Sequence, residues 1–272
     1  MRKKYQLILI FVLFIATAGM LGMVFKGQLS ERKEEKVENV QMDPVSTEPE
    51  EQENTEPVTE TVENVDEAEK DEEEVSIFTY SDPAYFDDAL FIGDSRTVGL
   101  YEYGTLKNAD YFATTGMSVY EVWEEKVSVE KVGRMTLKEL LHAKSYSKIY
   151  IMLGINELGY EFEKTVQTYK DSVSELQKLM PEAYIFICAN LHVGKERSDS
   201  DDVFNNKNID RFNQRIKEFA DNESIFYIDV NQKFDDENGN LKKECSNDSV
   251  HVQAKYYAEW CAWLCENTVQ RG

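Results

Sequence analysis

From residue 77 to the C-terminus, short apolar runs alternate with segments of helical spacing, and this alternation limits the possible folds more than any other feature. The runs are rich in β-branched and aromatic residues and lie at 89–92, 111–113, 148–153, 183–189 and 225–230. The helical segments span 119–127, 135–143, 162–180, 209–220 and 252–269. Alternating strands and helices build a parallel sheet with helices on both faces. We therefore expect a three-layer α/β/α domain over residues 77–272, with a mostly parallel sheet of about five strands.

The first 30 residues predict a membrane anchor. Basic residues at positions 2–4 precede an uncharged stretch from 7 to 25, which is long enough to cross a bilayer as one transmembrane helix. Because basic residues stay in the cytoplasm, the domain is expected outside it. The alternative is a cleaved signal peptide and a secreted protein, since Ala16-Thr17-Ala18 resembles a cleavage site. Apolar residues continue through 21–25, which favours the uncleaved single-pass anchor.

Residues 31–76 have a composition that predicts a disordered linker. Between 31 and 75 there are 19 acidic and 4 basic side chains, with almost no aromatic residues. Such a segment buries too little apolar surface to offset the chain entropy lost on folding. It carries most of the net charge of −22, which leaves the folded part mildly acidic. Because no basic face is indicated, nucleic acid is not expected as a partner.

The first apolar run ends in Gly93-Asp94-Ser95 and continues as a segment with helical character. A strand, a tight turn and a helix start place the Ser95 hydroxyl beyond the carboxyl end of a strand, where open α/β sheets bind their ligands. The positive end of the helix dipole favours negative charge at the same place. Ser95 is therefore the candidate nucleophile. The same residues are also typical of a helix N-cap turn, so this motif alone leaves both interpretations open.

The loops after the next two strands offer hydrogen-bond donors at the same edge of the sheet. Gly116 follows the second strand, and its backbone N–H can approach a substrate closely because no side chain intervenes. Asn156 follows the third strand and offers a side-chain amide. Together with the N–H of Ser95, they predict an oxyanion hole with three donors. Each residue alone is ordinary in a loop, but their placement after successive strands favours this interpretation.

A serine nucleophile needs a base, and the chain has three histidines. His251 precedes the last helical segment, with Asp248 three residues upstream. This spacing lets the carboxylate accept the Nδ1–H while Nε2 faces the serine; the alternative is a helix-capping aspartate beside an unrelated histidine. His192 follows the fourth strand at the same edge and is either a substrate contact or a surface loop residue. His142 lies at a helix end away from that edge.

Four segments, in chain order, resemble the sequence blocks of the SGNH hydrolase superfamily, also called GDSL esterases and lipases. They are Gly93-Asp94-Ser95, Gly116, Gly154-Ile155-Asn156-Glu157 and Asp248-Ser249-Val250-His251. The resemblance implies a flavodoxin-like fold. It also implies a triad of Ser95, Asp248 and His251, and an oxyanion hole formed by Ser95, Gly116 and Asn156.

Two residues depart from the pattern of that superfamily. Glu157 stands where the third block usually has aspartate, and Arg96 stands where the GDSL name has leucine. Both lie beside predicted site residues and are candidate substrate contacts, together with His192. A cation at Arg96 either favours an anionic substrate or pairs with a nearby carboxylate, and we favour the pairing.

The resemblance implies a serine esterase that needs no metal and no organic cofactor, and no metal-ligand spacing is found in the sequence. An outward-facing domain on a long tether can reach surface glycans. We therefore expect removal of O-acetyl or other short acyl groups from a carbohydrate or cell-surface polymer, with an acylated glycan or small molecule as substrate. The alternatives are an acyltransferase onto surface glycans and a catalytically inactive SGNH-like domain that binds a glycan or a protein. The complete set of serine, aspartate and histidine favours an enzyme.

Overall fold

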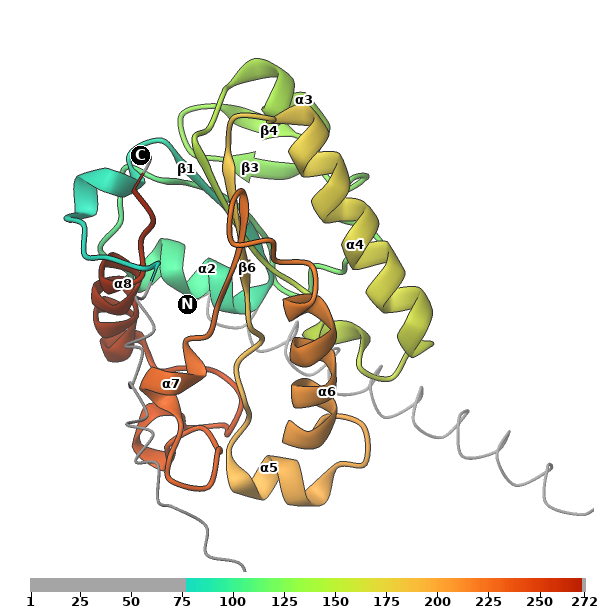
Figure 1. Cartoon of the computed structure of the whole chain (residues 1–272). Coiled ribbons are helices and arrows are strands. Elements are labelled where there is room, and N and C mark those ends of the chain that lie inside the picture. The colour runs from blue at the N-terminus through green and yellow to red at the C-terminus, as the bar shows by residue number, and fades with distance from the viewer. Residues whose placement is uncertain (1–76, 271–272) are drawn as a thin grey trace, which may run out of the picture. The chain divides into compact units, whose positions relative to one another are not determined.

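Five parallel strands form the central sheet of residues 77–270, the part of the chain that the computed structural model describes (Figure 1). The strands lie in the order β2-β1-β5-β6-β7. Their bounds are Ala89–Gly93 for β1, Asp110–Ala113 for β2, Lys148–Met152 for β5, Tyr184–Cys188 for β6 and Ile225–Ile228 for β7. The predicted α/β fold with a parallel sheet of about five strands is confirmed, and the strand order is the flavodoxin-like one.

Helices cover both faces of this sheet. On one face lie α3 (Leu137–Ala143), α4 (Phe162–Leu179) and α6 (Asn206–Lys217). On the other lie α2 (Ser95–Tyr103) and α8 (Tyr257–Glu266), with α7 (Asn231–Phe234) packed against α8. Successive strand residues alternate between the faces, so that Ile151 joins the core beside α4 and Tyr150 joins the core beside α8. Both faces are therefore buried, as a parallel sheet requires.

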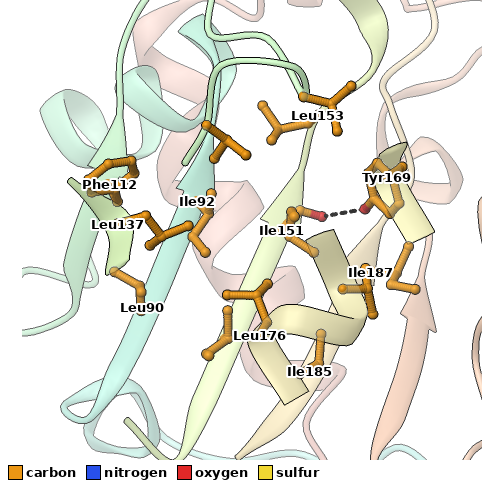
Figure 2. Close-up of a cluster of buried hydrophobic side chains, with 14 of the residues drawn as sticks. Leu90, Ile92, Phe112, Leu137, Ile151, Leu153, Tyr169, Leu176, Ile185 and Ile187 are labelled. Carbon is orange, nitrogen blue, oxygen red and sulfur yellow. Dashed lines mark hydrogen bonds between the residues drawn. The ribbon is translucent and has the colours of Figure 1, made fainter. Parts of the chain in front are cut away.

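Figure 2 shows the core between the sheet and α4. Leu176 of α4 is 0% exposed and belongs to the same apolar cluster as Ile185 and Ile187 of β6. The Tyr169 hydroxyl donates to the carbonyl of Ile151 at 3.2 Å, which satisfies its polar atom inside this apolar layer. Truncating a buried leucine of this kind to alanine typically costs about 2–5 kcal/mol. The layer therefore holds the strands, and the loops that follow them, in fixed positions.

The prediction of a helix over 119–127 is wrong. These residues form turns, and two short antiparallel strands follow, β3 (Val127–Val129) and β4 (Gly133–Met135). Val119 and Val122 are each 1% exposed and belong to the core beside α4. Their helical spacing thus reflects two buried turn residues rather than one face of a helix.

Other predicted segments are present with different bounds. Thr136 caps α3 in a capping box with Glu139, and the helix begins only after this cap. A short helix, α5 (Lys195–Ser200), lies between β6 and α6. Asp235 and Leu241 pair in a short antiparallel hairpin, and Gly239 has a φ of 73° at its turn.

The expected membrane anchor at 1–30 and the expected linker at 31–76 lie outside the described residues. Between residues 77 and 270, the structure contains no helix that is both long enough and apolar enough to cross a bilayer.

The strand register brings three loops to one edge of the sheet. Gly93 at the end of β1 is level with Ala113 of β2 and with Met152 of β5. The chain runs from β1 to β2 on one side and from β5 to β6 on the other, so β1 and β5 flank the point where the strand order reverses. Open α/β sheets bind ligands outside the carboxyl ends of the strands at this point.

Candidate active site

Ser95 is the first residue of α2 and follows β1 after a single turn residue. Asp94 caps the helix, because its Oδ1 accepts the backbone N–H of Arg96 at 2.9 Å. A Cβ on Gly93 would lie 2.1 Å from Oγ1 of Thr97, so only glycine allows the strand to pass directly into this helix. The capping interpretation and the nucleophile interpretation therefore apply to different residues, since Asp94 provides the cap and the Ser95 hydroxyl remains available.

The Ser95 hydroxyl lies within hydrogen-bonding distance of His251, which is 156 residues further along the chain. Oγ of Ser95 is 3.1 Å from Nε2 of His251. On the other side of the imidazole ring, Nδ1 is 2.8 Å from Oδ2 of Asp248. An ionised carboxylate only accepts hydrogen bonds, so Nδ1 carries the proton and Nε2 presents a lone pair to the serine. The three side chains form one continuous chain of hydrogen bonds.

The second oxygen of Asp248 fixes the loop in which it lies. Oδ1 accepts the backbone N–H groups of Val250 at 3.0 Å and of His251 at 2.8 Å, and the hydroxyl of Ser246 at 3.1 Å. Partial burial raises the pKa of Asp248, but hydrogen bonds from the backbone and ring of His251 outweigh it and hold this pKa well below its usual range. The aspartate is therefore ionised when it orients the histidine.

The predicted donors Gly116 and Asn156 meet in one cleft. Gly116 has a φ of 79°, in the left-handed region that favours glycine, and the described residues offer its N–H no acceptor. Nδ2 of Asn156 donates to the carbonyl of Met117 at 3.0 Å, and its second N–H is left for a ligand. This bond joins the two loops, so the donors are held relative to each other.

Arg96 is buried beside the nucleophile. Its side chain is 2% exposed, and Nη1 lies 3.9 Å from Oδ2 of the fully buried Asp94. Burial raises the pKa of Asp94, and the positive charge of Arg96 opposes that rise. The guanidinium therefore takes part in the carboxylate pairing that we favoured and is covered by protein.

Glu157 follows Asn156 in the same loop, and its carboxyl contacts Ser118 and Val119 of the loop that carries Gly116. It is 3% exposed, and burial raises the pKa of its carboxyl to about 7, although hydrogen bonds from Ser118 and Val119 lower it. The structure thus places Glu157 as a buried acid between the two loops, where only its small exposed part in the cleft wall can contact a substrate.

His192 occupies a separate acidic cluster. Its Nδ1 lies 2.7 Å from Asp235 and its Nε2 lies 2.9 Å from Asp210. Burial lowers the pKa of His192, but hydrogen bonds with both carboxylates outweigh it and raise the pKa above its usual value. Both ring nitrogens are occupied, and within residues 77–270 this ring makes no hydrogen bond to Ser95 or His251.

Some residues of the site were not found from the sequence. Ser246 supports Asp248, and the cleft beside Gly116 is lined by Tyr120, Tyr160 and Lys164. Tyr120 and Tyr160 each follow a predicted oxyanion residue by four positions. Aromatic residues in loops at the ligand-binding edge of the sheet were therefore the signal that could have identified them.

The fold is a doubly wound α/β sheet, and a serine, a histidine and an aspartate are joined by hydrogen bonds beyond the carboxyl ends of its strands. The family of GDSL-like lipases and acylhydrolases matches residues 91–259, and the chain belongs to this family. It is accordingly a carboxylic ester hydrolase. Among the 194 described residues from 77 to 270, no three His, Cys, Asp or Glu side chains form a group that could hold a metal ion.

Solved structures show the same fold. A protein from Streptococcus pneumonia named as a platelet activating factor is 20% identical, with a TM-score of 0.51, over 65% of this chain and 81% of that one. A GDSL-like lipase from Bacteroides thetaiotaomicron is 18% identical, with a TM-score of 0.50, over 65% of this chain and 86% of that one. No curated protein sequence matches the chain.

Proposed function

We propose that this protein is a serine esterase in which Ser95 attacks the ester, His251 transfers the proton and Asp248 orients His251. The observation that carries the proposal is the distance of 3.1 Å between Oγ of Ser95 and Nε2 of His251. The opposite ring nitrogen, Nδ1, lies 2.8 Å from Asp248. A positioned base next to a hydroxyl is the arrangement that activates serine as a nucleophile.

The reaction follows from these atoms. Nε2 of His251 takes the Ser95 proton as Oγ bonds to the carbonyl carbon, and the carbonyl oxygen becomes an oxyanion. The N–H groups of Ser95, Gly116 and Asn156 stabilise this charge. The carbon–oxygen bond to the alcohol then breaks, and His251 returns the proton to the departing oxygen. Water, deprotonated by His251, releases the acid from Ser95 by the same route.

For the substrate, we propose O-acetyl or other short acyl groups on a carbohydrate or cell-surface polymer. The side chains of His251 and Asp248 are 48% and 55% exposed, so the reacting centre is open to a large substrate. We further propose that residues 1–30 anchor the protein in the membrane, that 31–76 tether the domain, and that the domain acts outside the cytoplasm. Protease added to intact cells should then cleave the domain from its anchor, and protection from the protease would contradict this placement.

An acceptor hydroxyl in place of water would turn the same acyl-enzyme chemistry into transfer. Hydrolysis releases free acid, whereas transfer moves the acyl group to a second sugar, so the products distinguish the two reactions.

The test of the esterase function is hydrolysis of p-nitrophenyl acetate by the full-length protein and by Ser95→Ala. Removing the nucleophile should lower kcat by about a thousandfold or more, because the acyl-enzyme can no longer form. Ser128→Ala, at an exposed serine of β3, is the matched control and should keep wild-type activity. Equal hydrolysis by the wild type and by folded Ser95→Ala would refute the proposed nucleophile.

A further inference from the structure

A cleft of about 910 Å³, its open mouth included, extends from the two loop donors of the site. Gly116 and Asn156 form part of its wall, so a group bound in the cleft lies beside the proposed oxyanion position. Two tyrosines form a second part of the wall. The half-buried Ser118, the buried Glu157 and three exposed charged residues, Glu121, Glu161 and Lys164, complete the lining.

We propose that this cleft binds the sugar ring that carries the ester, and that the ring packs against Tyr120 and Tyr160. The charge of the cleft favours an uncharged glycan over a polyanionic one. The inference rests on the proposed esterase function, because it specifies the alcohol part of that substrate.

The two tyrosines provide a fixed aromatic surface. Their ring centroids are 5.8 Å apart, with 30° between the ring planes. The Tyr120 hydroxyl is hydrogen-bonded to Oγ1 of the buried Thr165 at 2.8 Å, which fixes the inner ring. The outer ring, Tyr160, is 65% exposed although it is a large side chain with an apolar body.

Tyr160 is also tied to the oxyanion loop. Its backbone N–H donates to the carbonyl of Glu157 at 2.9 Å, so it lies one turn beyond Asn156. An exposed aromatic surface at this place is suited to the C–H face of a sugar ring, which is apolar while its hydroxyls point outward. Ligand sites typically combine aromatic walls of this kind with a few polar groups.

The charged residues of the cleft suit hydroxyl groups better than they suit anions or an acyl chain. Glu121 and Glu161 offer acceptors, and the Lys164 ammonium offers donors, which leaves an excess of one negative charge among these accessible groups. Glu161 also caps α4, because its carboxylate accepts the backbone N–H groups of Glu163 and Lys164. The positive end of this helix is thus already neutralised. An added polyanion would meet net repulsion, and a long acyl chain would leave these charges poorly solvated.

The first experiment compares two acetyl esters that differ in the alcohol, O-acetyl xylotriose and p-nitrophenyl acetate, with the full-length protein. For Tyr160→Ala, we expect the ratio of kcat/KM on the sugar ester to kcat/KM on the nitrophenyl ester to fall at least tenfold, mainly through KM on the sugar. Tyr160→Phe keeps the ring and should restore the wild-type ratio. Tyr80→Ala, at a tyrosine that is 67% exposed outside the cleft, is the matched control and should leave the ratio unchanged.

A second comparison tests the charge of the cleft. The wild type should hydrolyse O-acetyl xylotriose with a kcat/KM at least tenfold above that for an O-acetylated trigalacturonate, which carries carboxylates. Glu121→Gln removes one repelling charge and should reduce this preference several-fold. An equal or greater rate on the anionic ester in the wild type would overturn the charge part of the proposal.

Binding separates failure of the cleft from failure of the esterase function. Ser95→Ala, titrated with O-acetyl xylotriose by calorimetry, should bind the sugar, and adding Tyr160→Ala should weaken Kd at least tenfold. Loss of hydrolysis with this binding pattern intact would reject the esterase function and keep the sugar cleft. Active enzyme whose ratio and Kd are unaffected by Tyr160→Ala would reject the cleft and keep the esterase function.

Discussion

The carboxylate of Asp248 binds both the ring and the backbone of His251. Oδ2 accepts from Nδ1 of the ring at 2.8 Å, while Oδ1 accepts from the backbone N–H of His251, also at 2.8 Å. One carboxylate thus sets both the rotation of the imidazole and the path of the chain that carries it. The intervening Ser249 has a φ of 61°, a conformation that residues other than glycine rarely adopt, which shows how tightly this loop is constrained.

Asp248→Asn should therefore impair catalysis while leaving the fold largely intact. The asparagine amide can donate a hydrogen bond to Nδ1, which would move the ring proton to Nε2 and remove the lone pair that faces Ser95. We expect kcat for p-nitrophenyl acetate to fall by about a thousandfold or more, with little change in KM. Steady-state kinetics measure this, with thermal unfolding to show that the variant is folded.

Ser246→Ala provides the comparison for that variant. The Ser246 hydroxyl donates to Oδ1 of Asp248 at 3.1 Å, alongside two backbone donors that remain after the substitution. The loss in kcat should therefore stay below about tenfold. If Ser246→Ala were as damaging as Asp248→Asn, orientation through Oδ2 would not be the main role of the aspartate.

Asn156→Ala should lower kcat by about a hundredfold to a thousandfold, because one donor to the oxyanion is lost while the negative charge still develops. The amide also donates to the Met117 carbonyl at 3.0 Å, so some loosening of the Gly116 loop is expected as well. Kinetics on p-nitrophenyl acetate distinguish the two effects, since a transition-state donor affects kcat and leaves KM nearly unchanged. A rise in KM with normal kcat would assign Asn156 to substrate binding instead.

The sheet and the loops at its edge were predictable, whereas several contacts between those loops were not. The five strands are short apolar runs separated by helical segments, and that periodicity is local. The spacing of Asp248 and His251 is local too. The bond between His251 and Ser95 depends on both loops reaching one edge of the sheet, which the alternation of strands and helices in a parallel sheet allowed us to anticipate.

The missed features depend on packing that is not local. β3 and β4 have three residues each, which is too few for an alternating strand pattern to be recognised. The helical spacing of the valines at 119 and 122 therefore dominated the interpretation of this region. His192 is enclosed by carboxylates from positions 18 and 43 residues away, so a pattern around His192 could not reveal them. Burial of Glu157 likewise follows from the packing of its own loop against Ser118 and Val119, about forty residues earlier in the chain.

Alanine at two glycines of the site should have unequal effects on stability. Gly154 has a φ of 110°, and a Cβ there would lie 2.2 Å from a ring carbon of Phe212 in the core. Gly116 has a φ of 79°, but a Cβ there would meet no atom within 4 Å. Gly116→Ala should cost only the backbone strain, about 1–2 kcal/mol. Gly154→Ala should cost about 2–5 kcal/mol, because overpacking adds to the strain.

Denaturant unfolding of the two variants measures this difference. Gly116→Ala also tests the proposed role of Gly116 in the oxyanion hole. The backbone N–H, which is the proposed donor, remains in place in this variant. It should retain more activity than Asn156→Ala. Equal stability of the two glycine variants would mean that Phe212 moves aside at little cost.

Glu157 should make the domain less stable as pH rises toward neutrality. Burial raises the pKa of its carboxyl from 4.5 to about 7, so the folded state binds the proton more tightly than the unfolded state does. Between these values the unfolded chain loses the proton first, and the free energy of unfolding falls as pH increases. The loss is complete above about pH 7 and amounts to about 3 kcal/mol.

Glu157→Gln should remove this part of the pH dependence, because the amide does not titrate. Oε2 of Glu157 is buried without a hydrogen-bond partner, so an amide at this place can itself lower the free energy of unfolding. This loss does not depend on pH, so it cancels when the same variant is compared at two pH values. We expect the free energy of unfolding to fall between pH 5 and pH 8 by about 2.5 kcal/mol more in the wild type than in Glu157→Gln. If the two proteins lose the same stability over this range, the proton on Glu157 is not linked to folding, and the carboxyl of Glu157 must be ionised throughout.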